Sequence, residues 1–102
     1  MWTMWAGNSH SYFSHPVPSK GMAKLYASAG EALVEVEVRE DPTGTYFGWI
    51  DADRDSGVPS MIWPSRFQLE MCFPYGIKGE VERGKGRVVQ LSVTRKQPEE
   101  SL

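Results

Sequence analysis

The stretch that most constrains this chain runs from Thr45 to Ser65 and reads T-Y-F-G-W-I-D-A-D-R-D-S-G-V-P-S-M-I-W-P-S. Two short aromatic segments flank a polar turn that contains glycine. Because side chains alternate along a strand, one face collects four large side chains: Phe47, Trp49, Met61 and Trp63. The opposite faces carry Ile50 and Ile62, which suit a core. We expect the glycine between the first two rings to keep the ring face open to a flat ligand.

Regular alternation predicts the strand that precedes this stretch. Valines alternate with charged residues from Ala32 to Glu40, which is typical of a half-buried strand. The tetrapeptide 41–44, D-P-T-G, predicts a turn, since proline presets φ and glycine accepts positive φ. A second strand, 45–51, follows at once, so these two strands are expected to form a hairpin.

The C-terminal half predicts more strands than helices. Phe67, Leu69, Met71 and Phe73 alternate with polar residues and Cys72, which favours extended structure over a helical turn beginning at Pro64-Ser65. A last hairpin is expected from strands 77–83 and 87–95, reversing at Gly84-Lys85-Gly86.

The N-terminal region, residues 1–30, shows no persistent period and predicts an irregular arm. A short helix over 21–29, ended by Gly30, or a leading strand would fit its second half. Its rings either dock on the domain or contact a partner or second subunit. The expected organisation is an arm (1–30), a domain of about five strands (31–97) and a polar tail (98–102). So many strands in a short domain favour a small closed all-β barrel, which leaves few open edges.

Composition excludes several functional classes. A chain of 102 residues supports one domain. It has no apolar run long enough for a membrane span and no secretory signal. The lone cysteine, Cys72, is expected to be buried and fits a reducing, cytoplasmic setting. Asp51, Asp53 and Asp55 are spaced like calcium ligands, but position twelve is Ile62 rather than glutamate, so a solvated turn is expected.

No catalytic set, phosphate-binding loop or cofactor motif is present, and His10 and His15 have no neighbouring ligand residue for a metal. The sequence therefore predicts a protein that is not an enzyme and holds no cofactor or metal.

Taken in order, these segments resemble a cold-shock domain. The segment T-Y-F-G-W-I is similar to that family's first aromatic motif, K-G-[FY]-G-F-I, with Phe47 and Trp49 in its two stacking positions. The segment S-M-I-W-P-S is similar to its second motif, V-F-V-H-F-S, with Met61, Trp63 and Pro64 in place of Phe, His and Phe. The resemblance implies a five-stranded OB-fold barrel that binds single-stranded RNA or DNA.

This chain departs from the family at two places. Thr45 replaces the lysine before the first motif, and the first strand carries Glu35 and Glu37 where an aromatic pair is expected. Acidic side chains on a strand that faces nucleic acid would repel phosphates.

The first function that follows is binding of single-stranded nucleic acid. Bases would stack on Phe47, Trp49 and Trp63, each worth on the order of 1–3 kcal/mol. Residues 76–96 hold six cations and two acids, net +4, whereas 31–75 hold three cations and nine acids, net −6. A basic hairpin beside the ring face would bind the backbone. The predicted nucleic-acid-binding residues are Phe47, Trp49, Met61, Trp63, Arg66, Lys78, Lys85 and Arg87.

The alternative is a non-catalytic protein-interaction or inhibitor module, of the kind that phages and plasmids encode. Exposed Trp, Tyr and Met side chains suit interface hot spots, and the acidic body could engage a basic partner. The aromatic arm, Trp2 to Phe13, could then join two copies in a homodimer.

Overall fold

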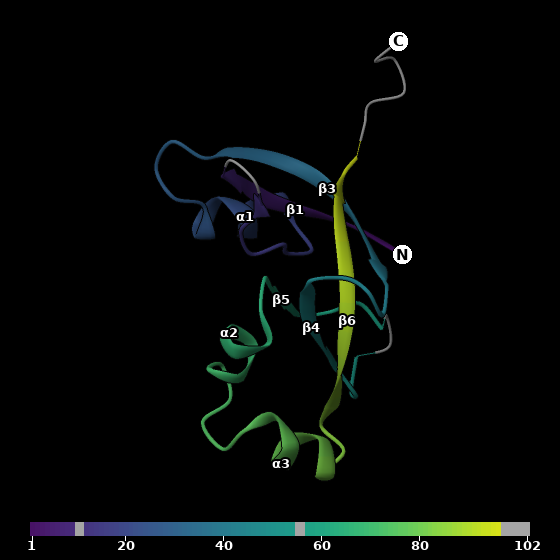
Figure 1. The fold of residues 1–102 in the computed structure, drawn as a ribbon. Helices are drawn as coiled ribbons and strands as arrows, with labels where there is room; N and C mark the ends of the chain where they lie inside the picture. The colour runs from purple at the N-terminus through teal and green to yellow at the C-terminus, as the bar shows by residue number, and fades with distance from the viewer. Residues whose placement is uncertain (10–11, 55–56, 97–102) are drawn as a thin grey trace.

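The computed structural model describes residues 1–9, 12–54 and 57–96. These residues form one antiparallel sheet in the order β2-β1-β3-β6-β4-β5. The sheet curls into a half-barrel with three short helices at its side (Figure 1). The predicted all-β class is thereby confirmed. Among the described strands, β2 and β5 each pair on one side only.

The N-terminal region is not the irregular arm that the sequence predicts. Its first residues form β1 (Trp2–Ser9), which pairs with β3 (Ala32–Glu40) from Trp2↔Val38 to Asn8↔Ala32. The chain then folds back as β2 (Tyr12–Phe13) and continues to Val17, which exchanges backbone hydrogen bonds of 2.8 and 2.9 Å with Trp5. Met4 and Ala6 are fully buried, so burial of alternate residues fixes β1 although its sequence has no clear period.

The helix expected in this region is α1 (Lys20–Tyr26), which packs on β1. Its N-cap is Ser19, whose hydroxyl accepts a hydrogen bond from the Met22 amide at 3.2 Å. It ends before Ala27 rather than at Gly30, and Ala23 is its buried residue.

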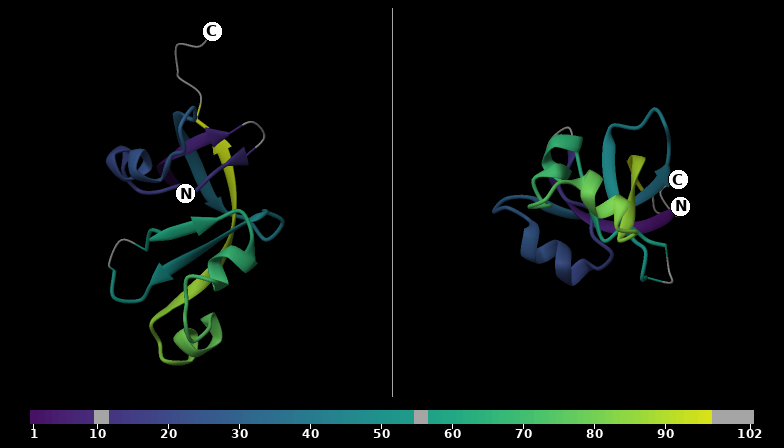
Figure 2. Two further views of the ribbon diagram at one scale, coloured as in Figure 1. Left: turned by 90° about the vertical axis from the view of Figure 1, so that its left-hand side faces the viewer. Right: turned by 90° about the horizontal axis from the view of Figure 1, so that it is seen from below.

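The strand predicted over 45–51 is β4 (Tyr46–Asp51), but the hairpin predicted between β3 and β4 is wrong. The long strand β6 (Gly86–Arg95) lies between them, pairing with β4 through residues 86–91 and with β3 through residues 91–95. Leu91 stands where the two ladders meet, opposite both Tyr46 and Glu40, and is fully buried. One strand therefore joins the two halves of the sheet (Figure 2).

The turn predicted at 41–44 is present and rests on β6. Thr43 donates to the Asp41 carboxylate from its amide at 2.9 Å and from its hydroxyl at 2.7 Å. Both hydrogen bonds lower the pKa of Asp41, and the one from the Thr43 hydroxyl has the larger effect. The Asp41 amide donates to the Gln90 carbonyl at 3.0 Å, and the Gln90 side-chain amide donates to the Gly44 carbonyl at 2.6 Å.

Two segments predicted to be extended are helical. Residues 66–70 form α2 (Arg66–Glu70), capped by the Ser65 hydroxyl, and residues 77–82 form α3 (Ile77–Glu82). The predicted 77–83/87–95 hairpin is absent, because residues 77–82 are helical and β6 pairs with β4 through residues 86–91 and with β3 through residues 91–95. In α2 the helical turn buries Leu69 and leaves Phe67 and Met71 exposed, whereas a strand would place all three on one face.

The core forms on both faces of the sheet. The larger cluster joins both halves: Met4, Ala6, Val34, Val36, Val38, Tyr46, Ile50, Ile62, Val89 and Leu91. The smaller cluster lies on the other face of β4 and β5 (Met61–Trp63), where α2 and α3 cover it, and contains Trp49, Leu69 and Ile77. In the part of the chain that the structure describes, no helix is long and apolar enough to cross a membrane.

Candidate functional site

The predicted ring face exists, with the strand faces that the sequence indicates. Phe47 lies opposite Trp63 and Trp49 opposite Met61 in the β4–β5 ladder. The four side chains belong to or pack against the smaller cluster. The predicted alternation of side chains along both strands is therefore confirmed.

This face is not open. Trp49 is only 2% exposed. Its ring lies 4.8 Å from that of Phe73, centroid to centroid, and Leu69 of α2 and Ile77 of α3 belong to the same cluster. A base cannot stack on Trp49 in this arrangement, because helical residues already occupy the space above it.

Gly48 does not hold the ring face open, contrary to the sequence interpretation. It points to the opposite face, where a Cβ at this position would lie 2.8 Å from Leu91 Cδ1. The absence of a side chain at Gly48 makes room for the core residue at the centre of β6.

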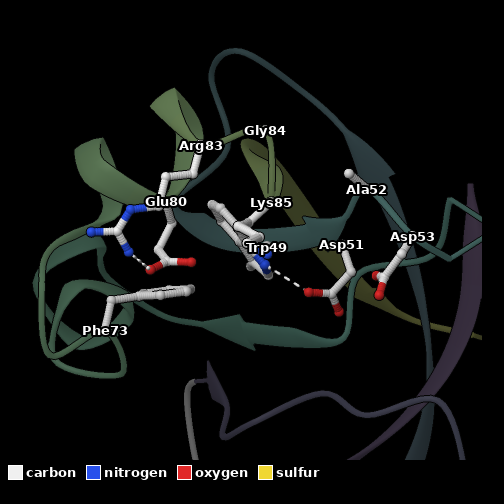
Figure 3. A pocket seen from close by; sticks show the side chains of 9 residues that line it. All are labelled: Trp49, Asp51, Ala52, Asp53, Phe73, Glu80, Arg83, Gly84 and Lys85. Carbon is white, nitrogen blue, oxygen red and sulfur yellow. Dashed lines mark hydrogen bonds and ion pairs between the residues drawn. The ribbon is translucent and has the colours of Figure 1, made fainter.

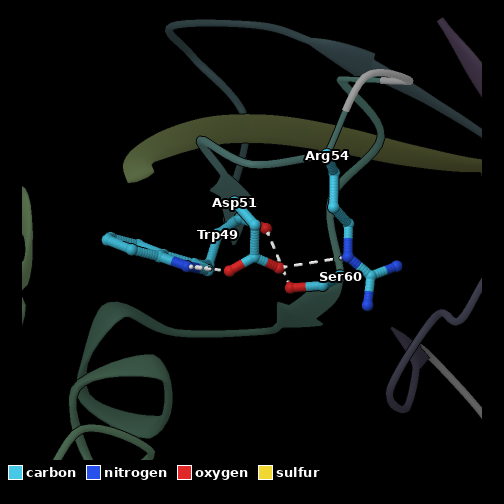
Figure 4. Close-up of polar contacts among 4 residues, drawn as sticks. All are labelled: Trp49, Asp51, Arg54 and Ser60. Carbon is cyan, nitrogen blue, oxygen red and sulfur yellow. Dashed lines mark hydrogen bonds and ion pairs between the residues drawn. The ribbon is translucent and has the colours of Figure 1, made fainter. Parts of the chain in front are cut away.

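The polar edge of Trp49 is bound within the chain (Figure 4). Its Nε1 donates to Asp51 Oδ1 at 2.9 Å, and Asp51 forms an ion pair with Arg54 at 3.4 Å. Asp51 thus orients an indole and a guanidinium. Asp55 lies outside the described residues. Among those described, no cluster of three or more His, Cys, Asp or Glu side chains is placed to hold a metal ion.

The predicted cationic residues do not gather at one edge. Arg66 pairs with Glu70 at 3.7 Å and Arg87 with Glu40 at 3.2 Å. At the far end of β6, Lys96 pairs with Glu35 at 3.4 Å. The predicted basic hairpin is wrong, since 77–82 is a helix. Lys78 and Lys85 are exposed and form no ion pair with any described residue.

A first aromatic-lined pocket has a volume of about 380 Å³ and lies beside Trp49, at the end of β4 (Figure 3). Phe73 forms a second apolar wall, and an ion pair of 3.2 Å between Arg83 and Glu80 borders one side. Lys85 reaches this pocket, whereas Phe47, Met61 and Trp63 do not line it. The lining holds three acids, Asp51, Asp53 and Glu80, and two bases, Arg83 and Lys85, so the charges nearly balance.

The second pocket, about 170 Å³, lies between α1 and α2 and was missed at the level of sequence. It is lined by Ser14, His15, Tyr26, Trp63, Pro64 and Gln68. His15 is the central ring. Its centroid lies 4.1 Å from that of Trp63, edge to face, and 4.5 Å from that of Tyr26. Burial lowers the pKa of His15.

Two buried polar atoms of residues that line this pocket have no hydrogen-bond partner among the described residues: His15 Nδ1 and Trp63 Nε1. Both atoms are inaccessible to bulk solvent. Buried polar groups are nearly always hydrogen-bonded, so these two atoms are exceptions among the described residues. No local pattern points to this contact, because His15 and Trp63 are 48 residues apart in the sequence.

The two helices that each contribute a residue to the second pocket, α1 and α2, also carry large, exposed apolar side chains. Leu25 and Tyr26 of α1 are 83% and 55% exposed, and Phe67 and Met71 at α2 are 73% and 72% exposed. Together with Met22 they are called here the α1–α2 surface. Cys72, predicted to be buried, is exposed next to it.

No protein-family model, curated protein or solved structure matches this chain. The resemblance to the cold-shock domain thus stays a prediction.

Proposed function

We propose that this protein is a non-catalytic interaction module that binds a protein partner through the α1–α2 surface. One observation carries the proposal: the two helices that border one pocket each carry large, exposed apolar side chains. Exposed apolar groups gathered in this way are typical of interaction sites, and aromatic and Met side chains are enriched in interface cores. A cytoplasmic setting belongs to the proposal and rests on the single, unpaired cysteine.

At Leu25 and Phe67, the α1–α2 surface has no packing role that requires an apolar residue. The buried residues of its helices are Ala23 and Leu69, which attach α1 and α2 to the sheet. Leu25 and Phe67 contribute little to that attachment because most of their surface is in water. Folding would tolerate polar residues at both positions, so a contact outside this chain is the simplest role for them.

Single-stranded nucleic acid binding is the second candidate. It is favoured by Tyr75, which is 79% exposed with the Arg83 guanidinium 6.0 Å from its ring, and by exposed Lys78 and Lys85 nearby in sequence. A ring flanked by cations could stack a base and neutralise phosphates. This site would use α3 rather than the covered Trp49.

Matched variants distinguish the two candidates. Phe67→Ser removes a ring from the α1–α2 surface, and Tyr75→Ser removes an equally exposed ring outside it. Wild-type and variant proteins would be immobilised, and proteins retained from an extract of the expressing cells would be purified and titrated individually. The proposal expects a purified protein whose binding weakens at least tenfold with Phe67→Ser and is unchanged with Tyr75→Ser.

A labelled single-stranded oligonucleotide, titrated at low and moderate salt, tests the second candidate. Salt-sensitive binding that is lost with Tyr75→Ser and kept with Phe67→Ser would replace the first proposal by the second. Sedimentation of the wild-type protein alone tests the homodimer, which stays a prediction.

A further inference from the structure

We infer that the free edge of β6, at residues 86–90, binds an extended segment of a partner protein that carries a basic residue and adds to the sheet as a further strand. This inference concerns a surface other than the α1–α2 surface and does not rest on the proposed function. Three features lead to it: the register of β6, the hollow beside its first half, and the protection of the two outer edges of the sheet.

The first half of β6 is paired on one side only. Residues 86–91 pair with β4, but β3 ends at Glu40, opposite Leu91, so the β3–β6 ladder covers only residues 91–95. Figure 1 shows β6 continuing beyond the end of β3. Residues 86–90 therefore have an edge that no described strand occupies.

The backbone of Val88 points to this free edge. The Gln90 carbonyl accepts from the Asp41 amide at 3.0 Å on the β3 side, and backbone groups two residues apart in a strand point the same way. The Trp49 carbonyl, opposite Val88, is directed away to β5, where it accepts from the Ser60 amide at 2.9 Å. The amide and carbonyl of Val88 thus have no backbone partner among the described residues. The backbone of an extended segment would pair with both.

A hollow of about 310 Å³ borders this edge. It is lined by residues of β6 on one side and by the end of β3 and the following turn on the other: Arg87, Val89, Gln90, Glu40, Asp41 and Pro42. Arg87 and Gln90 are exposed, and Val88 between them is half-buried. The hollow therefore provides space on the β3 side of β6, where an added strand would lie.

The lining also indicates the composition of the segment. It holds two acids and one base, and the base, Arg87, already pairs with Glu40 at 3.2 Å. Asp41 remains, and its lowered pKa keeps it ionised at neutral pH. A lysine or arginine in the segment would complement this charge. Because β-branched residues suit a pleated, half-buried surface, we expect them beside Val89.

The outer edges of the sheet offer less to such a segment. At β2, the Tyr46 hydroxyl accepts a hydrogen bond from the Phe13 amide and donates one to the Phe13 carbonyl, each at 2.9 Å. At the other end, β5 is three residues long and lies between Pro59 and Pro64, which have no amide to donate. By comparison the edge of β6 is unprotected, and unprotected edges readily pair with other strands.

Hydrogen exchange of the assigned backbone amides tests the edge in the wild-type protein. After correction for intrinsic rates, we expect the Val88 amide to exchange at least tenfold faster than that of Val89, which faces β4 opposite Gly48. A Lys-Thr-Val-Lys-Val-Thr-Lys peptide, added at up to about 1 mM, should slow exchange at Val88 more than at Val89. Equal protection of both amides in the free protein would show that the edge is covered, and the inference would be wrong.

Fluorescence anisotropy of the same peptide, labelled with fluorescein, measures its affinity. One control peptide has its inner amides N-methylated, which keeps the side chains and removes the backbone donors; another carries glutamate for lysine. We expect each control to bind at least tenfold more weakly. Val88→Pro should weaken binding of the first peptide as much, because it removes an amide that does not pair with β4. If this variant does not fold, exchange and the control peptides still decide the matter.

Absence of binding at 1 mM, or binding that survives N-methylation, overturns the inference. Protection of Val88 that rises with protein concentration in the absence of peptide would assign the edge to a second copy of this chain, and would overturn it as well. None of these results depends on Phe67, so they leave the proposed function to its own test.

Discussion

Replacing Gly44 by alanine tests the crossing of the 41–44 turn over β6. A Cβ at this position would lie 2.0 Å from the Leu91 carbonyl oxygen and 2.3 Å from its carbonyl carbon. Both are backbone atoms of a strand paired on both sides, so no side-chain rotation relieves the clash. The turn and the strand would have to separate by roughly 1 Å or more to reach an ordinary contact distance.

The expected cost follows from what that separation disturbs. Overpacking in a well-packed region costs about 1–3 kcal/mol. The same movement strains two hydrogen bonds between the turn and Gln90, each worth about 0.5–1.5 kcal/mol. The free energy of unfolding should fall by about 2–6 kcal/mol, a large part of the 5–15 kcal/mol typical of a domain. The melting temperature should fall by at least ~8 °C.

Urea denaturation followed by tryptophan fluorescence measures this change, with the slope against denaturant checked for two-state behaviour. The matched control is Gly79→Ala in α3, where a Cβ meets nothing within 4 Å. Alanine is the better helix former there and should stabilise by about 0.5–1 kcal/mol. A loss below ~1 kcal/mol in Gly44→Ala would refute the close crossing of turn and strand.

Two further predictions concern single side chains. Tyr46→Phe removes a hydroxyl that accepts a hydrogen bond from the Phe13 amide and donates one to the Phe13 carbonyl, each at 2.9 Å. The variant should therefore have a free energy of unfolding lower by about 1–3 kcal/mol. A melting temperature within error of the wild-type value would contradict this role. Burial lowers the pKa of His15 below its ordinary value of 6.5, so on acidification the unfolded chain binds the proton before the folded chain does. The free energy of unfolding should therefore have its full value above pH 6.5 and fall as the pH drops from there through the folded-state pKa. Denaturation at pH 7.5 and 5.5 measures that loss, which should shrink in His15→Gln, and an equal loss in both proteins would count against it.

Local patterns predicted the strands whose two faces differ in polarity. The valines of β3, the paired rings of β4 and β5 and the alternation in β6 each fix a register by burial of one face. The turn at 41–44 could equally be predicted from the sequence, because its proline and glycine favour a turn geometry. These features depend on residues close together in sequence.

Features that depend on contacts between distant segments of the chain could not be predicted from the sequence. The interval 77–83 alternates well enough for a strand, but residues 77–82 form α3, and β6 pairs instead with β4 and β3. Likewise β1 has no clear period and is a strand because the edge of β3 is free to receive it. In neither case does the alternation of residues along the sequence reveal which strands pair in the sheet.

The candidate site shows the same division. The sequence placed Phe47, Trp49, Met61 and Trp63 on one face, as observed, but it could not show that α2 and α3 cover Trp49. Nor could it bring His15 to Trp63, since that contact depends on how the segment after β2 returns along β1.

The position of β6 has a consequence for the order in which this protein folds. Of the strands described, it is the last to be synthesised and the one that is hydrogen-bonded to both halves of the sheet. On the ribosome, β1 with β3 and β4 with β5 are available early, but neither pair has the strand that closes its core. Such dependence on distant pairing slows folding, and the apolar faces stay accessible to chaperones or to aggregation in the meantime. The nascent chain should therefore become protease-resistant in one late step, after residues 86–95 have left the exit tunnel.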